Sequence, residues 1–139
     1  MPCCPVAREA HAARGAPGTA GRTQEIKRLI GRSLLAAVDL TLLGERQIIV
    51  AVTCCRPTAA RTASINGGFV ALALACGVWW PKGVIAENPV KRTIAAVSVG
   101  MVGDAYLDLD YRLDLAADVD FSMVMTDDER FVEVQGGGR

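Results

Sequence analysis

Residues 91–125 have the sequence KRTIAAVSVGMVGDAYLDLDYRLDLAADVDFSMVM, and this stretch decides the fold. Residues 94–102 form a continuous apolar run rich in Val and Ile, which predicts a buried strand. Gly103-Asp104 is a two-residue hairpin signal, so a second strand is expected directly after it. An irregular segment is expected over residues 113–119, and a third strand over residues 121–126. The stretch therefore predicts consecutive strands of a sheet.

Six aspartates lie in this stretch, at positions 104, 108, 110, 114, 118 and 120. Asp108 and Asp110 are expected on one face of the second strand, because successive side chains of a strand alternate. Asp114 and Asp120 flank the irregular segment. Two carboxylates at the end of a sheet repel unless a cation or a shared proton lies between them, which is how oxygen-ligated magnesium sites are built. The alternative is a set of solvated aspartates, because acidic surface loops need no ligand.

Length and composition limit the domain count. The chain has 139 residues, of which 51% are hydrophobic, so it can bury one core and is too short for two ordinary domains. No apolar run reaches the roughly eighteen residues of a membrane span, and the longest, residues 69–80, is expected to be a buried helix. Nine of fifteen basic residues lie in positions 1–62, and ten of fifteen acidic residues lie in positions 104–133. This segregation favours a basic face opposite an acidic one, which suits a polyanion bound beside a metal site.

The five cysteines and the single histidine argue against several kinds of site. The cysteines form two adjacent pairs and a singleton, without the Cys-x-x-Cys spacing of a zinc site. An odd number in this arrangement is no disulfide framework, so a reducing compartment, the cytoplasm, is expected. His11 lies in an Ala- and Gly-rich segment, which argues against Ser-His-Asp and Cys-His catalysis.

Toward the amino terminus, two helices and a strand are expected. Residues 1–20 have no hydrophobic period and contain three prolines, which predicts a flexible segment. A helix is expected from Arg22, with Gly44 as its stop. Residues 46–55 are rich in β-branched side chains and predict a strand. The apolar stripe of the first helix comprises Ile26, Leu29, Ile30, Leu34 and Val38.

The second helix and the last strand complete the predicted order. The helix, from Thr62 to about Cys76, is apolar almost all round and is expected to be the most buried helix. A strand over residues 130–135 is expected to pair with residues 121–126, and residues 137–139 form a tail. Arg61 ends a loop just before this helix, where backbone N–H groups already favour an anion.

Four segments of the sequence carry a family resemblance: GRTQEIKRLIGRSLLAAVDL from Gly21, RTASINGG from Arg61, NPVKRTIAAVSVGMV from Asn88, and LDLDYRLDLAADVDFSMVMTDDERFVEVQG from Leu107. In this order, they resemble segments of the ribonuclease PH family of phosphate-dependent tRNA 3′-end exoribonucleases, which are also called tRNA nucleotidyltransferases. The similarity covers nearly all of residues 21–136. It implies a single α+β domain in which a mixed sheet is layered with helices, without the family's amino-terminal and carboxy-terminal portions. A sheet edge and an apolar face are then expected to be uncovered.

The resemblance implies that inorganic phosphate attacks the terminal phosphodiester of an RNA 3′ end and releases a nucleoside diphosphate. The expected roles are tRNA and rRNA processing, with no membrane partner and with assembly into a homodimer or a hexameric ring. Arg22 and Arg61 match the family's phosphate-binding arginines, and Ala59 and Ala60 match positions of its phosphate-binding loop. Arg28 is the candidate RNA-binding residue. An alternative role for Arg22 is that of a solvated arginine.

Asp114 and Asp120 match the family's paired catalytic aspartates. The resemblance implies that they hold Mg²⁺. Asp120 has an alternative role as the acid that protonates the leaving oxygen. Leu115 replaces a serine that the family has after the first of these aspartates.

The loop before Arg61 departs from the family. Residues 57–60 are Pro-Thr-Ala-Ala where the family has Asp-Gly-Gly-Thr, which removes a hydroxyl donor at Ala60 and the conformational freedom of two glycines. One lost hydrogen bond to a charged ligand costs about 1.5–3 kcal/mol, or roughly ten- to hundredfold in phosphate affinity. Two alternatives follow: a non-catalytic subunit or RNA-binding module, and a plain acidic metal-binding domain. Convergence of Arg22 and Arg61 on Asp114 would argue against the latter.

Overall fold

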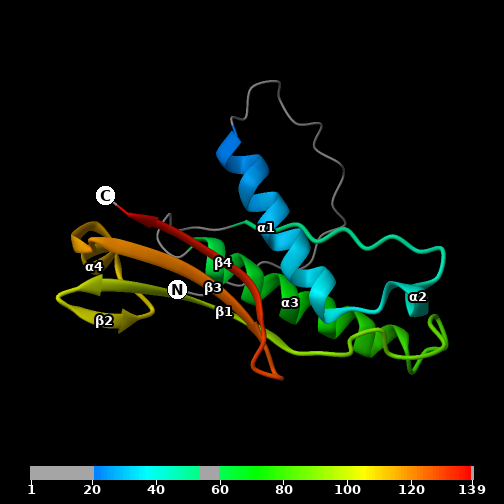
Figure 1. Cartoon of the computed structure of the whole chain (residues 1–139). Coiled ribbons are helices and arrows are strands. Elements are labelled where there is room, and N and C mark those ends of the chain that lie inside the picture. Colours follow the sequence, from blue (N-terminus) through cyan, green and yellow to red (C-terminus); the bar gives the residue numbers. More distant parts are fainter. Residues whose placement is uncertain (1–20, 54–59, 139) are drawn as a thin grey trace, which may run out of the picture.

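The computed structural model describes residues 21–53 and 60–138 (Figure 1), with the side chains of residues 21–23 and 60 left out. The prediction for residues 1–20 and the candidate Ala59 therefore lie outside the described residues. The elements in chain order are α1 (Gly21–Ala37), α2 (Leu40–Leu43), α3 (Ala60–Trp79), β1 (Ile94–Val102), β2 (Asp104–Leu107), α4 (Tyr111–Ala116), β3 (Val119–Thr126) and β4 (Phe131–Gly138).

One four-stranded sheet, in the order β2-β1-β3-β4, organises the fold. The predicted strand over residues 94–102 is confirmed, with identical bounds, as β1. Gly103, with φ of +75°, makes the predicted turn into β2. Every strand pair of the described residues is antiparallel, so the α+β class is confirmed but the sheet is not mixed.

The last strand is longer than predicted. β4 continues through Gly136 and Gly137 to Gly138, so its expected end at Gln135 is wrong. The glycines are held in the strand because they pair with β3, where Gly137 lies opposite Asp120. Backbone pairing thus extends the sheet into a segment that has no side chains to predict a strand.

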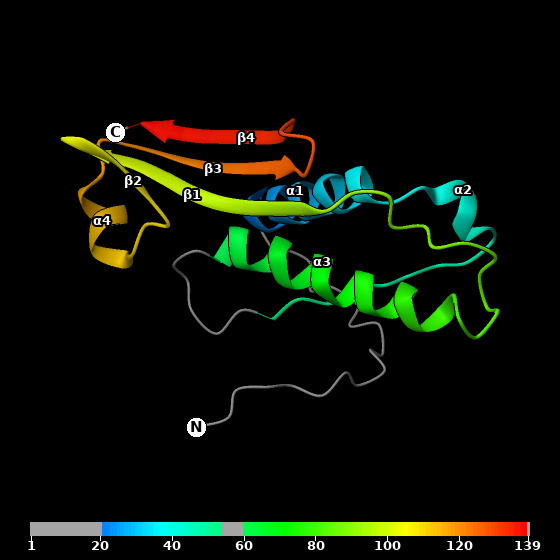
Figure 2. The same cartoon turned by 90° about the horizontal axis from the view of Figure 1, so that it is seen from below.

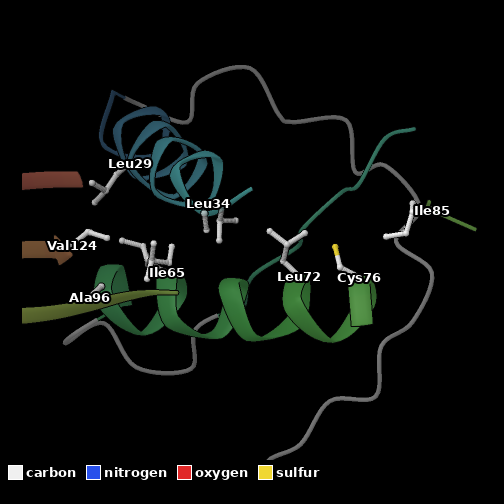
Figure 3. Close-up of a cluster of buried hydrophobic side chains, with 10 residues drawn as sticks. Leu29, Leu34, Ile65, Leu72, Cys76, Ile85, Ala96 and Val124 are labelled. Carbon is white, nitrogen blue, oxygen red and sulfur yellow. The ribbon is translucent and has the colours of Figure 1, made fainter. Parts of the chain in front are cut away.

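Helices α3 and α4 lie on the same side of the sheet (Figure 2). α1 packs on that side too, because Leu29 belongs to one buried cluster with Ile65 and Val124. Buried side chains of α1 and α3 contact those on the inner face of β1 and β3 (Figure 3). Asn66 of α3 also forms two hydrogen bonds with the backbone of β1. The Ala96 N–H donates to Asn66 Oδ1 at 2.8 Å, and Asn66 Nδ2 donates to the Ala96 carbonyl at 2.9 Å. The buried core consists of Leu29, Leu34, Ala37, Ile65, Leu72, Cys76, Ile85, Ile94, Ala96 and Val124.

The predicted strand over residues 46–55 is wrong for the part that the structure describes. Residues 46–53 belong to no strand, although Ile48 and Val50 are half-buried while Ile49 is exposed, an alternation typical of a strand. The segment crosses the helix layer near Gly68 of α3. Its β-branched residues favour an extended backbone, but a strand also requires a hydrogen-bonded neighbour.

The first helix is shorter than predicted. α1 ends at Ala37, and Gly44, with φ of +66°, ends the separate helix α2. Asp39 begins α2 by accepting a hydrogen bond from the Thr41 N–H at 3.0 Å. Hydrogen bonds from the Thr41 hydroxyl and N–H lower the pKa of Asp39. An N-cap inside the predicted helix therefore divides it into two.

α3 is buried on one face rather than all round. Ile65, Leu72 and Cys76 face the core, while Val70 and Leu74 are exposed. By length and apolar composition alone, Arg61–Trp79 could cross a membrane. A core helix meets the same criterion, and α3 packs on α1 and β1 through its buried face.

The segment between β2 and β3 also differs from its prediction. β2 ends at Leu107, and Asp108 has a left-handed backbone with φ of +58°, which breaks the strand alternation. Asp110 caps α4 by accepting from the Arg112 N–H at 2.9 Å and the Leu113 N–H at 2.8 Å. The expected pairing of Asp108 and Asp110 on one strand face is therefore wrong, and a helix replaces the predicted irregular segment.

Candidate active site

A cleft of about 420 Å³ lies where the first turns of α1 and α3 meet β3 and β4. It contains one guanidinium and two carboxylates, with a carboxamide on the strand side. The bottom of the cleft is made partly of backbone, because two glycines of β4 contribute no side chain. The lining residues are Glu25, Ile26, Arg61, Asp120, Gln135, Gly136 and Gly137.

Asp120 is the second residue of β3 and is half-buried. It pairs with Gly100 of β1 and Gly137 of β4. Cross-strand partners share a face, and the pair Ala96 and Val124 places this face toward the helices. A Cβ at Gly137 would lie 3.4 Å from Asp120 Oδ1. Glycine at this position therefore leaves room beside the carboxylate.

Arg61 is the second residue of α3, is half-buried and lines the same cleft as Asp120. Among the ion pairs of the described residues, none joins these two side chains. A guanidinium and a carboxylate that share a cleft without neutralising each other can bind opposite parts of one charged ligand. The structure thus brings together one of the expected arginines and one of the expected aspartates.

The other predicted site residues are not gathered in the same way. Asp114 lies exposed on α4 and does not line the cleft. Arg28 is exposed on α1, one turn after the cleft residues of that helix. Arg22 and Ala60 lie in the first turns of α1 and α3, but their side chains are outside the described part of the chain.

α4 is nevertheless held on the side of the sheet that carries Asp120. A Cβ at Gly100, the β1 partner of Asp120, would lie 2.6 Å from Leu109 Cδ1 and 3.3 Å from the Ala117 methyl group. Leu109 and Ala117 flank α4 and are both buried. The helix that bears Asp114 is thus anchored over the immediate neighbour of Asp120.

Two cleft residues, Glu25 and Gln135, have no counterpart among the predicted site residues. Gln135 Nε2 donates a hydrogen bond to Glu25 Oε1, which joins the first turns of α1 to β4. In the sequence, Glu25 lies outside the apolar stripe of the first helix, and Gln135 is the last residue of the strand expected over residues 130–135. No motif signals their contact, because 110 residues separate them.

The cleft offers oxygen ligands for a divalent cation but no complete protein cage. Within the described ranges, no group of three or more His, Cys, Asp or Glu side chains is arranged to hold a metal ion. Mg²⁺ typically binds one or two carboxylates together with water and substrate phosphates, so Asp120 alone fits part of such a shell. Asp114, the second expected ligand, does not line the cleft.

Comparisons with known proteins identify related chains. No protein-family model matches. The chain is 51% identical over 118 residues to ribonuclease PH of Thermosynechococcus vestitus and 51% identical over 118 residues to ribonuclease PH of Neisseria meningitidis serogroup B, covering 84% of this chain and 49% of each relative. It therefore spans about half the length of these relatives. A chain of an archaeal exosome core matches with a TM-score of 0.58 and 18% identity, over 84% of this chain and 52% of that chain, and supports the fold alone.

Proposed function

We propose, from the premise that this chain belongs to the ribonuclease PH family, that it carries the phosphorolytic site of a 3′-to-5′ exoribonuclease acting on tRNA 3′ ends. The observation that carries the proposal is the shared cleft of Arg61 and Asp120. These side chains come from a helix and a strand that are separated by 59 positions in the sequence, so the fold is required to bring them together. Proteins of this family depend on phosphate, and the Arg61 guanidinium in the cleft is a group that can bind phosphate.

In the proposed reaction, inorganic phosphate is the nucleophile. The guanidinium of Arg61 binds two phosphate oxygens and orients a third toward the terminal phosphodiester. A bond forms between that oxygen and phosphorus, and the bond from phosphorus to the 3′ oxygen of the preceding nucleotide breaks. The proton that hydrogen phosphate loses balances the proton that the 3′ oxygen gains. The products are a nucleoside 5′-diphosphate and an RNA shortened by one nucleotide. Positioning and electrostatics supply most of the catalysis.

Asp120 is proposed to act at the attacked phosphoryl group. Its carboxylate is an oxygen ligand for Mg²⁺, with Asp114 as the proposed second carboxylate. A bound Mg²⁺ would neutralise charge that develops on the phosphoryl oxygens. In the alternative role, the protonated Asp120 side chain gives its proton to the leaving 3′ oxygen. Either role requires a carboxyl group at this position of β3.

The proposed partners follow from the same family. RNA with an unpaired 3′ end is the substrate, with Arg22 completing the phosphate site and Arg28 contacting the RNA strand. A homodimer or a hexameric ring is the proposed assembly, and the cytoplasm is the proposed compartment. The buried, free thiol of Cys76 is compatible with that compartment.

A non-catalytic RNA-binding relative is the second candidate function. The observation that favours it is the Pro-Thr-Ala-Ala sequence of residues 57–60, which lacks the hydroxyl donor and the glycines expected of the phosphate loop. Such a protein would bind RNA without releasing nucleotides. Phosphate dependence distinguishes the two candidates.

The test is nucleoside diphosphate release from a short RNA with an unpaired 3′ end, measured with Mg²⁺ and with or without phosphate. Release that requires phosphate and falls at least a hundredfold in Asp120→Asn supports the enzyme. Asp118→Asn is the matched control, because Asp118 is exposed two residues earlier and does not line the cleft. RNA binding without phosphate-dependent release would instead support the non-catalytic relative.

A further inference from the structure

We propose that Gln135 and Glu25 are positioning residues of the phosphate site, and this inference rests on the proposed function. Their hydrogen bond joins α1 to β4 beside Asp120. It fixes the helix turn that follows Arg22 relative to the strand that pairs with Asp120. The bond also keeps the Glu25 carboxylate on the strand side of the cleft.

Among the described side chains, two polar links join α1 to β4, and only the Glu25–Gln135 bond lies in the cleft. Arg32 Nη2 lies 3.0 Å from Glu133 Oε1, seven residues along the helix and two residues back along the strand. Seven helical residues span about 10 Å, or two turns, so both links lie on the same face of α1. The Arg32–Glu133 pair docks the middle of the helix, whereas the Glu25–Gln135 bond determines where its first turn lies.

Gln135 is the last residue of β4 that can make such a link. Residues 136–138 are all glycine, so no side chain beyond Gln135 reaches from this strand to the helix. Gln135 pairs with Ser122, and the next inward position pairs Gly137 with Asp120. Gln135 and Gly137 are thus successive residues on the helix-facing side of β4, and Gly137 lies opposite Asp120. The Glu25–Gln135 bond is therefore close to the Asp120 carboxylate along the strand.

The carboxamide also controls a charge in the cleft. Glu25 and Arg61 both line the cleft. If the Glu25 carboxylate were released from Gln135, it could pair with the Arg61 guanidinium, which phosphate binding requires. A neutral donor holds Glu25 without adding a competing cation. Loss of this donor should weaken phosphate binding more than it slows the bound enzyme, because it alters the binding site rather than the reacting group.

The experiment compares Gln135→Glu with the double variant Glu25→Gln/Gln135→Glu. The first sets two carboxylates against each other, and the second restores a carboxamide–carboxylate bond in the opposite direction. We expect Gln135→Glu to raise the KM for phosphate about tenfold with a smaller change in kcat, and the double variant to recover most of that loss. Calorimetric titration with inorganic phosphate, without RNA or Mg²⁺, should show the same order of affinities.

Arg32→Gln is the matched control, because it breaks the other link between the same two elements. It should lower the melting temperature at least as much as Gln135→Glu while leaving the KM for phosphate unchanged. An equal rise in KM in Arg32→Gln, or no recovery in the double variant, would overturn the positioning role. An unmodified chain that neither binds phosphate nor releases nucleotides would refute the proposed function itself, and this inference with it.

Discussion

At the scale of single residues, two adjacent glycines of β4 limit the site in different ways. A Cβ at Gly136 would lie 2.3 Å from Phe121 Cδ1, whereas a Cβ at Gly137 would lie 3.4 Å from Asp120 Oδ1. A methyl group at Gly136 would clash with an aromatic ring, whereas a methyl group at Gly137 would be in contact with the proposed catalytic carboxylate. A substitution at Gly136 should therefore mainly affect stability, and a substitution at Gly137 should mainly affect activity.

We expect Gly136→Ala to lower the free energy of unfolding by about 1–3 kcal/mol, because the added methyl group requires Phe121 to move. Gly137→Ala should change stability much less and lower the rate of nucleotide release, because its methyl group crowds Asp120. Urea denaturation and single-turnover assays of both variants test this separation. The prediction fails if Gly137→Ala is the less stable variant and keeps full activity.

Asp128, in the turn between β3 and β4, provides a test by pH. A hydrogen bond from the Thr126 hydroxyl lowers the pKa of Asp128, and the charges of Arg92 and Arg130 add to that effect against a contribution of desolvation. A carboxyl group with a lowered folded-state pKa stabilises the protein above its unfolded pKa of about 3.9 and loses this contribution as pH falls through the folded pKa.

The urea midpoint of the unmodified chain should therefore fall as pH is lowered below about 4. Asp128→Asn should be less stable at pH 7, and the difference between the two proteins should narrow at low pH. Asp127→Asn is a control from the same turn. A constant difference between the Asp128 variant and the unmodified chain across this range would show that the ionised carboxylate is not the stabilising form.

The sequence was sufficient for some residues of the site and not for others. Arg61 and Asp120 could be predicted because they match a family motif, and they share a cleft in the structure. The contact between Glu25 and Gln135 could not be predicted, because these residues are 110 positions apart and meet only when α1 packs on the sheet. Contacts between side chains of distant elements depend on tertiary packing, which local sequence patterns do not specify.

At the scale of elements, α4 shows how a cap changes a prediction. Asp110, followed by Arg112, Leu113 and Ala116, is a signal for the start of a helix, but six aspartates in one stretch are also typical of an acidic loop. β1 was predicted with correct bounds because its apolar run is continuous, whereas residues 46–53 lack a hydrogen-bonded neighbour in the described chain. Local pattern thus defines an extended conformation better than it defines a sheet.

Asp110→Ala should destabilise α4 by about 1 kcal/mol, because the carboxylate accepts from two N–H groups in the first turn. Hydrogen exchange at Arg112 and Leu113 should accelerate, while exchange in β1 stays unchanged. Asp108→Asn is the control, since asparagine also tolerates the left-handed backbone at that position. Equal acceleration in both variants would contradict the capping role.

At the scale of the whole molecule, the described residues leave apolar side chains exposed on the side of the helix layer away from the sheet. A groove of about 1210 Å³ lies among α1, α3 and residues 40–52. Outside this groove, Ile49 and Leu74 are both more than 60% exposed. Exposed apolar surface of this kind favours association. Within residues 21–53 and 60–138, apolar side chains of α3 are therefore exposed on the face that does not pack on the core.

Leu74→Lys should reduce concentration-dependent association without lowering the melting temperature, because the side chain lies on the exposed face of α3. Ile65→Ala, on the buried face of the same helix, should lower the free energy of unfolding by about 2–5 kcal/mol. Sedimentation and thermal melting measure the two effects. A strong loss of stability in Leu74→Lys would mean that this face is covered.

Phosphate as the nucleophile distinguishes phosphorolysis from hydrolysis, and one measurement identifies the nucleophile directly. RNA with an unpaired 3′ end is incubated with the chain, Mg²⁺ and radiolabelled inorganic phosphate, and the released nucleotides are separated. Phosphorolysis through Arg61 and Asp120 predicts nucleoside diphosphates labelled in the β-phosphate, with the label lost in Asp120→Asn and retained in Asp118→Asn. Release of unlabelled nucleoside monophosphates, or no release from a folded protein that binds the RNA, would contradict it.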